Sequence, residues 1–174
     1  MSSRLEDLAP DAQGPIRMFL NNLAAQGIRG IIPQNGISTS RTHWEQFVTW
    51  LQGRSSEAVV DVARQHVGFT PINAKDASAI VTKADGINSL SNHQSGRAID
   101  WVPLRADGTA IWYPSTAEEV ATYKKVAEVA RACGLSCGQD WEPKDPNTGL
   151  GWDSDHYELP PAQPKSLGVA GSNF

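Results

Sequence analysis

Two short segments that lie far apart in the sequence each place a histidine close to a carboxylate. The first is "SNHQSGRAIDW" (residues 91–101), and the second is "WDSDHYEL" (residues 152–159). A catalytic zinc ion takes three protein ligands from histidine and carboxylate side chains and keeps a further position for water. One such set can be assembled across the two segments. Its members are His93, Asp100 and His156.

These side chains need turns and strands that bring them together. Ser95 and Gly96 favour a turn directly after His93, and glycine tolerates the backbone conformation that such a turn can require. The segment "RAIDWVP" (97–103) predicts a strand, because its residues alternate in type, and its proline ends the strand. His156 opens a second short strand. Taken alone, a histidine followed by an aspartate is also typical of a capped turn and a surface carboxylate.

The rest of the chain predicts helices that hold those strands in place. Apolar residues recur at helical spacing in several segments that begin at a capping residue or end at glycine. We expect helices over residues 11–26, 42–53, 55–66 and 115–133, and short strands over residues 28–33, 97–103, 136–141 and 154–159. Helices followed by strands mixed with one long helix indicate an α+β fold. We expect a small antiparallel sheet that carries the zinc site and packs against several helices.

Capping residues predict where three of these helices begin. Asp11 is the expected cap of the first helix, and Thr42 is the expected cap of the second. The long helix has two alternative capping boxes, which are Ser115 with Glu118 and Thr116 with Glu119.

Length and composition favour a single soluble domain. The 174 residues suit one core, and we expect a catalytic domain over residues 1–159 with a flexible tail over residues 160–174. The net charge is −4 and no basic cluster is present, so nucleic acid is not an expected partner. No apolar run could span a bilayer or form the core of a signal peptide, so we expect synthesis in a cytoplasm without membrane insertion. We also expect a monomer.

Other residues that could do chemistry have simpler structural explanations. "GLSCG" (134–138) matches the G-x-S-x-G pattern of serine hydrolases, but that motif needs a strand that turns into a helix, and here the order is reversed. Cys133 and Cys137 are too few for a zinc clip, and we expect small buried thiols. His43 and His66 have no partner at ligand spacing, so we expect surface positions on the helices.

The complete pattern of the first segment is more specific than its two candidate ligands. It reads S-x-H-x-x-G-x-A-x-D and is met by Ser91, His93, Gly96, Ala98 and Asp100. This pattern resembles the signature of the zinc peptidases that include D-alanyl-D-alanine carboxypeptidases and phage L-alanyl-D-glutamate endopeptidases, with a hedgehog-type fold. The second half of that signature is an acid three residues before a histidine, and "WDSDHYEL" is similar to it. The resemblance extends over roughly residues 29–159.

The resemblance implies a role for each residue of the site. His93, Asp100 and His156 would bind one zinc ion. Asp153 would be the general base that takes a proton from the attacking water, and Arg41 would hold the developing oxyanion. Zinc lowers the pKa of water to about 7 and polarises the scissile carbonyl. A carboxylate can carry the proton to the leaving amine, and a fixed guanidinium stabilises the charge of the transition state.

The acid at position 153 points to one branch of this family. The D-Ala-D-Ala enzymes typically carry glutamate there, whereas aspartate looks more like the phage L-alanyl-D-glutamate endopeptidases. We therefore expect an endolysin that hydrolyses the L-Ala–D-Glu amide of bacterial peptidoglycan. It would accumulate in the host cytoplasm and reach the cell wall once a separate holin opens the membrane. The alternatives are a D-Ala-D-Ala carboxypeptidase or dipeptidase on the same scaffold, and a non-catalytic module that binds wall peptides.

Two other acids leave the identity of the base open. Asp155 stands where relatives of this family often have proline, and we expect the strand to direct it away from His156. Asp140 is a weaker competitor of Asp153.

Three further residues have both a functional and a structural interpretation. Ser91 and Trp141 are the candidate substrate-binding residues, although a turn hydroxyl and core packing explain them as well. Glu158 alternates onto the same face as His156, where it could support that ligand or be a solvated strand carboxylate.

Overall fold

The computed structural model describes residues 4–33 and 42–160. Its helices are η1 (Leu5–Asp7), α1 (Pro10–Ala25), α2 (His43–Trp50), α3 (Glu57–His66), α4 (Ala74–Ala77), α5 (Ala117–Ala132) and η2 (Gly138–Asp140). Its strands are β1 (Gly30–Ile31), β2 (Ala98–Asp100), β3 (Val102–Pro103), β4 (Ser136–Cys137) and β5 (His156–Glu158). Within the described ranges, no helix has the length and apolar character needed to cross a membrane.

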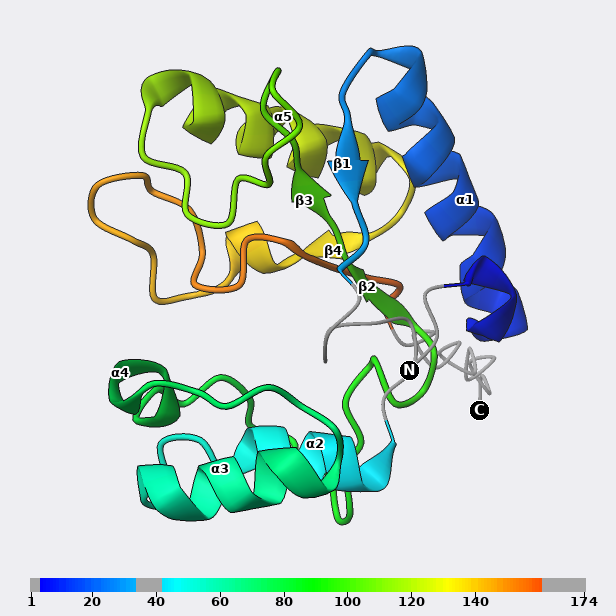
Figure 1. Ribbon diagram of the computed structural model, residues 1–174. Helices are drawn as coiled ribbons and strands as arrows, with labels where there is room; N and C mark the ends of the chain where they lie inside the picture. Colours follow the sequence, from blue (N-terminus) through cyan, green and yellow to red (C-terminus); the bar gives the residue numbers. More distant parts are fainter. Residues whose placement is uncertain (1–3, 34–41, 161–174) are drawn as a thin grey trace, which may run out of the picture.

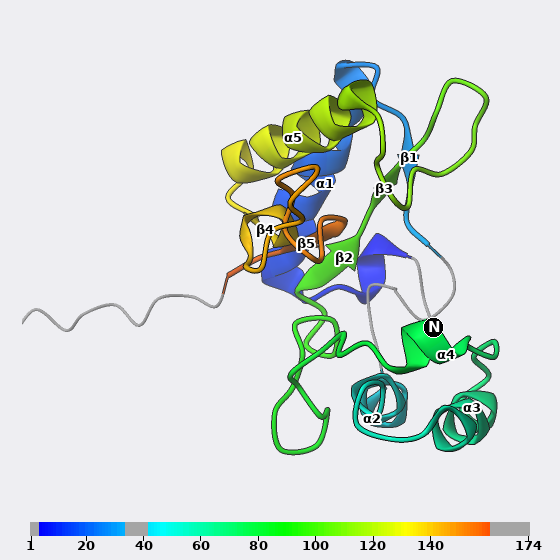
Figure 2. The ribbon, with the colours of Figure 1, turned by 90° about the vertical axis from the view of Figure 1, so that its left-hand side faces the viewer.

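The strands form two small antiparallel sheets. β1 pairs with β3, and β5 lies between β2 and β4 in a three-stranded sheet. α1 and α5 pack beside the strands, whereas α2, α3 and α4 lie together at the opposite end of the molecule (Figure 1). The turned view shows the same separation (Figure 2). The predicted α+β fold, with a small antiparallel sheet and several helices, is confirmed.

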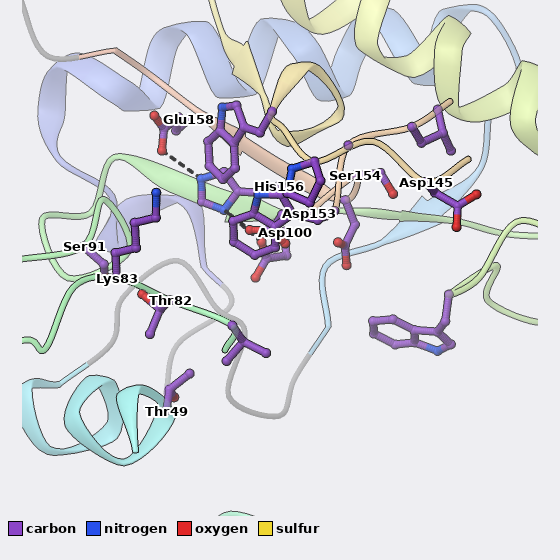
Figure 3. Close-up of a pocket in the computed structure, with 18 of the residues that line it drawn as sticks. Thr49, Thr82, Lys83, Ser91, Asp100, Asp145, Asp153, Ser154, His156 and Glu158 are labelled. Atoms are coloured by element: carbon purple, nitrogen blue, oxygen red, sulfur yellow. Dashed lines mark hydrogen bonds and ion pairs between the residues drawn. The ribbon is translucent and has the colours of Figure 1, made fainter. Parts of the chain in front are cut away.

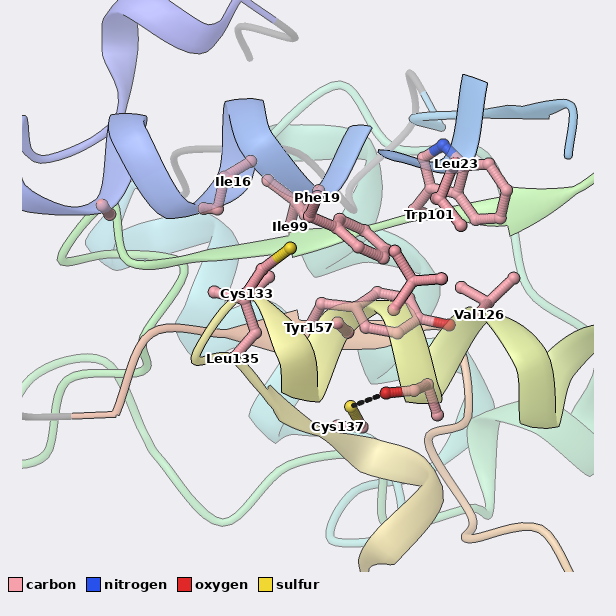
Figure 4. Packing of buried hydrophobic residues seen from close by; sticks show 14 of the residues in the cluster. Ile16, Phe19, Leu23, Ile99, Trp101, Val126, Cys133, Leu135, Cys137 and Tyr157 are labelled. Carbon is pink, nitrogen blue, oxygen red and sulfur yellow. Dashed lines mark hydrogen bonds between the residues drawn. The ribbon is translucent and has the colours of Figure 1, made fainter. Parts of the chain in front are cut away.

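The main core lies between α1, α5 and the three-stranded sheet (Figure 4). The ring of Phe19 on α1 contacts those of Tyr157 on β5 and Trp101, with centroids 4.9 and 6.1 Å apart. Ile99 of β2 and Val126 of α5 are fully buried in the same cluster. Burial of each such side chain is worth roughly 1.5–3 kcal/mol. The core therefore gives β2 and β5, which carry two of the candidate ligands, a rigid base.

The strand predicted over residues 97–103 is divided into two. β2 pairs with β5 and β3 pairs with β1, so the chain changes partner at Trp101. The backbone N–H of Trp101 donates to the carbonyl of Asp155 at 2.8 Å, outside both sheets. The prediction of an extended segment was right. Its interpretation as one strand was wrong, because the partners on the two sides of Trp101 belong to different sheets.

Two of the predicted helix caps are present and one is not. Thr42 forms a reciprocal capping box at the start of α2. Of the two boxes considered for α5, Thr116 with Glu119 is the one that forms. Asp11 does not cap α1, because a proline occupies the first helical position and places Asp11 inside the helix. Its carboxylate instead pairs with Arg97.

A buried glutamine joins α2 to the loop that precedes the first ligand. The side chain of Gln46 is completely buried. Its Nε2 donates to Oγ1 of Thr82 at 3.0 Å and to the carbonyl of Ala84 at 2.8 Å, and its Oε1 accepts from Oγ of Ser91 at 3.0 Å. Because both amide donors and the carbonyl are used, Gln46 fixes α2 and residues 82–84 relative to the loop of Ser91. No sequence pattern singled out this residue.

Candidate metal centre

His93, Asp100 and His156 lie together at one end of the three-stranded sheet. Asp100 is the last residue of β2 and His156 is the first of β5, and the antiparallel register places them opposite each other. Figure 3 shows both side chains at the same point of the site. His93 reaches that point from the turn before β2. The structure thus brings together all three ligands that the two sequence segments predicted.

The turn between His93 and β2 has the predicted form. The N–H of Gly96 donates to the carbonyl of His93 at 3.1 Å, and the N–H of Arg97 donates to that of Asn92 at 2.8 Å. Gly96 has a φ of +67°, in the left-handed region that favours glycine. A Cβ at this position would also lie 2.8 Å from the backbone nitrogen of Ala9. Glycine is therefore required both by the turn and by the approach of α1.

The spacing of the ligand atoms fits a single zinc ion. Nε2 of His93 lies 3.1 Å from Nδ1 of His156. Oδ1 of Asp100 lies 3.4 Å from the first nitrogen and 3.3 Å from the second. A tetrahedral zinc ion with ligands at about 2.0–2.1 Å separates its ligand atoms by about 3.3 Å. All three residues are buried.

The charges of the ligands stabilise one another. Burial raises the pKa of Asp100, but the charges and hydrogen bonds of His93 and His156 outweigh it, so the pKa lies well below its usual value. Burial lowers the pKa of His156, but hydrogen bonds to Asp100 and Glu158 outweigh it and raise the pKa to about 10. Asp100 is therefore ionised, as a zinc ligand must be, and zinc must displace a proton from His156.

Glu158 holds the imidazole of His156 from the side opposite the other ligands. Its Oε2 lies 2.8 Å from Nε2 of His156 and accepts from Nδ2 of Asn92 at 2.7 Å. When Nδ1 of His156 binds a metal, Nε2 carries the proton and donates it to Glu158. A carboxylate in this position fixes the ring orientation and makes the ligand nitrogen more basic. Of the two interpretations of Glu158, the structure shows the contact with the ligand.

We expect Glu158→Gln to weaken zinc binding by roughly 10- to 100-fold, because a neutral amide stabilises the bound imidazole less than a carboxylate does. Titration of the metal-free protein with zinc in a competing chelator measures this change. Glu128→Gln is the matched control, since Glu128 lies on the surface of α5 and pairs only with Lys125 among the described residues. Equal zinc affinities for the two variants would show that Glu158 does not support the ligand.

Asp153 stands beside the ligands in the turn that leads into β5. Its Oδ2 lies 3.9 Å from Nδ1 of His156, and its side chain is 30% exposed. The N–H of His156 donates to the backbone carbonyl of Asp153 at 3.1 Å, which ties the position of the acid to that of the ligand. A partly exposed carboxylate at this distance is suited to accept a proton from a water molecule near the metal.

The turn that carries Asp153 rests directly on the backbone of η2. A Cβ on Gly138 would lie 1.9 Å from the carbonyl oxygen of Asp153. A Cβ on Gly151 would lie 2.1 Å from the carbonyl oxygen of Gly138, and the N–H of Gly151 donates to the carbonyl of Gln139 at 2.9 Å. Glycine is needed at both positions because backbone meets backbone. The sequence showed Gly138 only as the end of "GLSCG" and gave no signal for Gly151.

We expect Gly138→Ala to displace the turn of Asp153, lower hydrolytic activity at least about tenfold and destabilise the fold by roughly 1–3 kcal/mol. Thermal unfolding and wall hydrolysis measure the two effects. Gly14→Ala is the matched control: Gly14 lies in α1, and an added Cβ there would meet nothing within 4 Å. Unchanged activity in Gly138→Ala would mean that the turn can move without affecting catalysis.

The two competitors of Asp153 differ in their surroundings. Asp140 forms an ion pair with Arg131 at 2.8 Å on the protein surface, away from the ligands. Asp155 lies in the turn before β5, so the strand alternation that was expected to direct it away from His156 does not apply to it. Burial and the charges of Asp100 and Asp153 raise the pKa of Asp155 to about 8. Asp155 also lines the same cleft as Asp153.

The metal centre opens into a cleft of about 980 Å³ between the sheet and the helices α2 and α3. Trp141 and Trp152 line this cleft. The ring of Trp141 contacts that of His156 at 4.9 Å and that of Trp152 at 5.7 Å between centroids. Trp141 therefore both packs on a ligand and forms part of the wall. Ser91 also lines the cleft, with its hydroxyl donating to Gln46, and its substrate role stays a prediction.

The remaining candidates lie away from the centre or outside the described residues. Arg41, the predicted oxyanion-binding residue, falls outside them, as does the tail after residue 160. His43 and His66 are exposed helix-end residues, as expected. Cys133 and Cys137 are free, buried thiols, as expected.

Comparisons with known proteins bear on the family and on the fold. A family model described as D-alanyl-D-alanine carboxypeptidase matches residues 85–147, a range that includes His93 and Asp100 and ends before Asp153 and His156. No curated protein sequence matches the chain significantly.

Three solved structures illustrate the structural likeness. The L-Ala D-Glu endopeptidase ChiX of Serratia marcescens is 18% identical over 90% of this chain and 83% of its own, with a TM-score of 0.46. The vancomycin resistance D,D-pentapeptidase VanY, in complex with Zn(II), is 20% identical over 87% of this chain and 72% of its own, with a TM-score of 0.48. The LD-carboxypeptidase LdcB is 15% identical over 87% of this chain and 58% of its own, with a TM-score of 0.50. It shares the overall fold.

The matched family and the donor set point to the same chemistry. The family model covers the segment whose S-x-H-x-x-G-x-A-x-D pattern supplies two ligands, and the structure adds the third at zinc-binding distance. The family model thus matches the part of the chain that carries His93 and Asp100, and the three candidate ligands have the donor types and the spacing of a zinc site.

Proposed function

We propose that this protein is a zinc-dependent peptidoglycan hydrolase that cuts the L-Ala–D-Glu amide of the stem peptide. The observation that carries the proposal is the set of three buried ligand atoms at zinc spacing, with Asp153 beside them and a cleft in front. The description of the matching family model supports a peptidoglycan substrate. The choice of bond rests on the aspartate at position 153, which resembles the endopeptidase branch of the family.

Each residue of the proposed site would carry out one part of the reaction. A zinc ion held by His93, Asp100 and His156 would lower the pKa of water and polarise the scissile carbonyl. Asp153 takes a proton from the attacking water and passes it to the leaving amine of D-Glu as the amide bond breaks. By the sequence resemblance, Arg41 holds the negative charge that develops on the carbonyl oxygen.

Residues around the ligands keep this arrangement in place. Glu158 holds the proton on Nε2 of His156, so that Nδ1 stays available as a ligand. The ring of Trp141 packs against that of His156, with centroids 4.9 Å apart, and helps to hold the imidazole in place. The close packing of Gly138 against Asp153 fixes the turn of the base.

A second candidate is hydrolysis of the terminal D-Ala–D-Ala bond on the same scaffold. It is favoured by the description of the family model, which names a D-alanyl-D-alanine carboxypeptidase. The catalytic residues would be the same, and the two candidates differ only in which part of the stem peptide the cleft accepts. A non-catalytic module that binds wall peptides is a third candidate, and it leaves Asp153 without a role.

Mass spectrometry of digested muropeptides separates these candidates. We expect products in which D-Glu has become the new amino terminus, with the terminal D-Ala retained. Release of D-Ala from peptides whose L-Ala–D-Glu bond stays intact would support the second candidate. Binding to the wall without any cleavage, with zinc present, would support the third. Asp153→Asn serves as the inactive control in each digest.

We also propose that the protein acts as a phage endolysin and as a monomer. It would be made in the host cytoplasm and reach peptidoglycan after the membrane is opened. The support is the sequence resemblance to phage endopeptidases at position 153. Expression of the protein in bacteria with and without a membrane-permeabilising holin tests the endolysin role, and we expect lysis only when the protein and the holin are both present. Analytical ultracentrifugation tests whether the protein is a monomer.

A further inference from the structure

Lys83 differs from the other cations that line the cleft. Within the described part of the chain, three cationic side chains line it, namely Arg64, Lys83 and Lys144. Nε of Arg64 donates to the carbonyl of Thr70 at 2.7 Å, and Nζ of Lys144 donates to the carbonyl of Gln139. Lys83 is exposed and makes no hydrogen bond or ion pair with any described residue. Its ammonium group is thus available to a molecule in the cleft.

The backbone on both sides of Lys83 is fixed. Nε2 of Gln46 donates to Oγ1 of Thr82 and to the carbonyl of Ala84, and Arg54 donates to the carbonyl of Thr82 at 3.1 Å. The side chain of Lys83 projects from this fixed segment into the cleft, on the side of His156 and Glu158 (Figure 3). A cation on a fixed backbone loses less entropy on binding a ligand than one on a mobile loop.

The other wall of the cleft is acidic. Six carboxylates of the described residues line the cleft, namely those of Asp100, Glu142, Asp145, Asp153, Asp155 and Glu158. A zinc ion bound at the centre would offset part of this charge, but its open position is taken by the reacting groups. A substrate that carries free carboxylates is therefore repelled by this wall unless a cation meets them. Lys83 lies in the cleft, where its ammonium group can pair with such a carboxylate.

We propose that Lys83 is a substrate-binding residue whose ammonium group pairs with a free carboxylate of the stem peptide. This inference rests on the proposed function, because the stem peptide supplies the carboxylate. Under cleavage of the L-Ala–D-Glu bond, the carboxylate nearest the scissile nitrogen is the α-carboxylate of D-Glu. Under cleavage of the D-Ala–D-Ala bond, it is the terminal carboxylate of D-Ala. The first is the partner expected here, and the shared chemistry is a carboxylate on the leaving side of the bond.

Steady-state hydrolysis of matched substrates by the full chain loaded with zinc tests this pairing. One pair of muropeptides carries D-Glu with either an α-carboxylate or an α-carboxamide. A second pair ends in D-Ala with either a free carboxylate or an amide. The enzymes are the wild type, Lys83→Met, Lys83→Arg and Lys124→Met. Lys124→Met removes the same charge from the exposed face of α5, away from the cleft.

For the wild type, we expect amidation of the D-Glu carboxylate to lower kcat/KM roughly 5- to 20-fold, mainly through KM. Lys83→Met should lose that discrimination while keeping its zinc and melting temperature. Lys83→Arg and Lys124→Met should behave like the wild type. Added salt should reduce the discrimination of the wild type, because an exposed charge pair is screened.

The possible results separate this inference from the proposed function. If only the terminal D-Ala pair shows the effect of Lys83→Met, Lys83 pairs with the carboxylate of the second candidate reaction. If the wild type and Lys83→Met respond equally to both amidations, Lys83 binds no substrate carboxylate and the inference alone is wrong. If the wild type cleaves none of these peptides, the proposed function is wrong and the inference falls with it.

Discussion

Replacement of His156 by alanine is expected to abolish zinc binding and hydrolysis together. Nδ1 of His156 lies 3.1 Å from His93 and 3.3 Å from Asp100, so its loss leaves a two-ligand site. It also leaves Asp100 with one imidazole partner in place of two, and Glu158 loses its contact with the ring. Structural and catalytic zinc sites in proteins hold at least three protein ligands. We expect zinc affinity and activity to fall by a factor of at least about 1000.

Zinc stoichiometry after gel filtration and hydrolysis of purified wall measure the two losses. His66→Ala is the matched control, because His66 is exposed at the end of α3 and its ring contacts the carbonyl of Val62. A melting temperature for His156→Ala close to that of zinc-free wild type shows that the fold is kept. A His156→Ala protein that still holds one zinc ion would show that the metal lies elsewhere.

Asp153→Asn is expected to separate zinc binding from catalysis. The carboxylate of Asp153 stands 3.9 Å from the ligand nitrogen of His156 and is not one of the three ligand atoms. The amide keeps the size of the side chain but cannot accept the proton of the attacking water. We expect zinc stoichiometry to stay at the wild-type value and kcat to fall by roughly 10²- to 10⁴-fold, the usual contribution of a general base.

Asp155→Asn is the comparison that decides which acid acts as the base. Asp155 lines the same cleft, and its raised pKa, about 8, means that it is largely protonated at neutral pH in the protein without metal. We expect Asp155→Asn to reduce kcat far less than Asp153→Asn does. A greater loss in Asp155→Asn, with zinc retained, would move the role of base from Asp153 to Asp155.

The ligand set could be predicted from the sequence because its signals are local. His93 and Asp100 lie within one turn and strand, and Gly96 marks the positive φ that the turn requires. The acid before His156 marks the second segment. The two segments lie far apart in the sequence, so the pairing of β2 with β5 is not a local signal. It follows, however, once the ligands on both strands must bind one metal ion.

Features that depend on contacts between distant segments could not be predicted. The division of the strand at Trp101 depends on a change of partner between two sheets. Gln46 looks like any helix residue until Thr82, Ala84 and Ser91 surround its amide.

The same limit applied to two glycines. The need for glycine at Gly138 and Gly151 arises only when η2 meets the turn of Asp153. The predicted cap of α1 was wrong for a local reason: Pro10 begins the helix and places Asp11 inside it.

Metal content measured alongside wall hydrolysis bears most directly on the zinc site of His93, Asp100 and His156. The protein should purify with, or take up, one zinc ion per chain. Removal of that ion by a chelator should abolish hydrolysis, and one equivalent of zinc should restore it. Full hydrolysis by protein from which all metal has been removed would contradict the zinc mechanism, whatever bond of the stem peptide is cut.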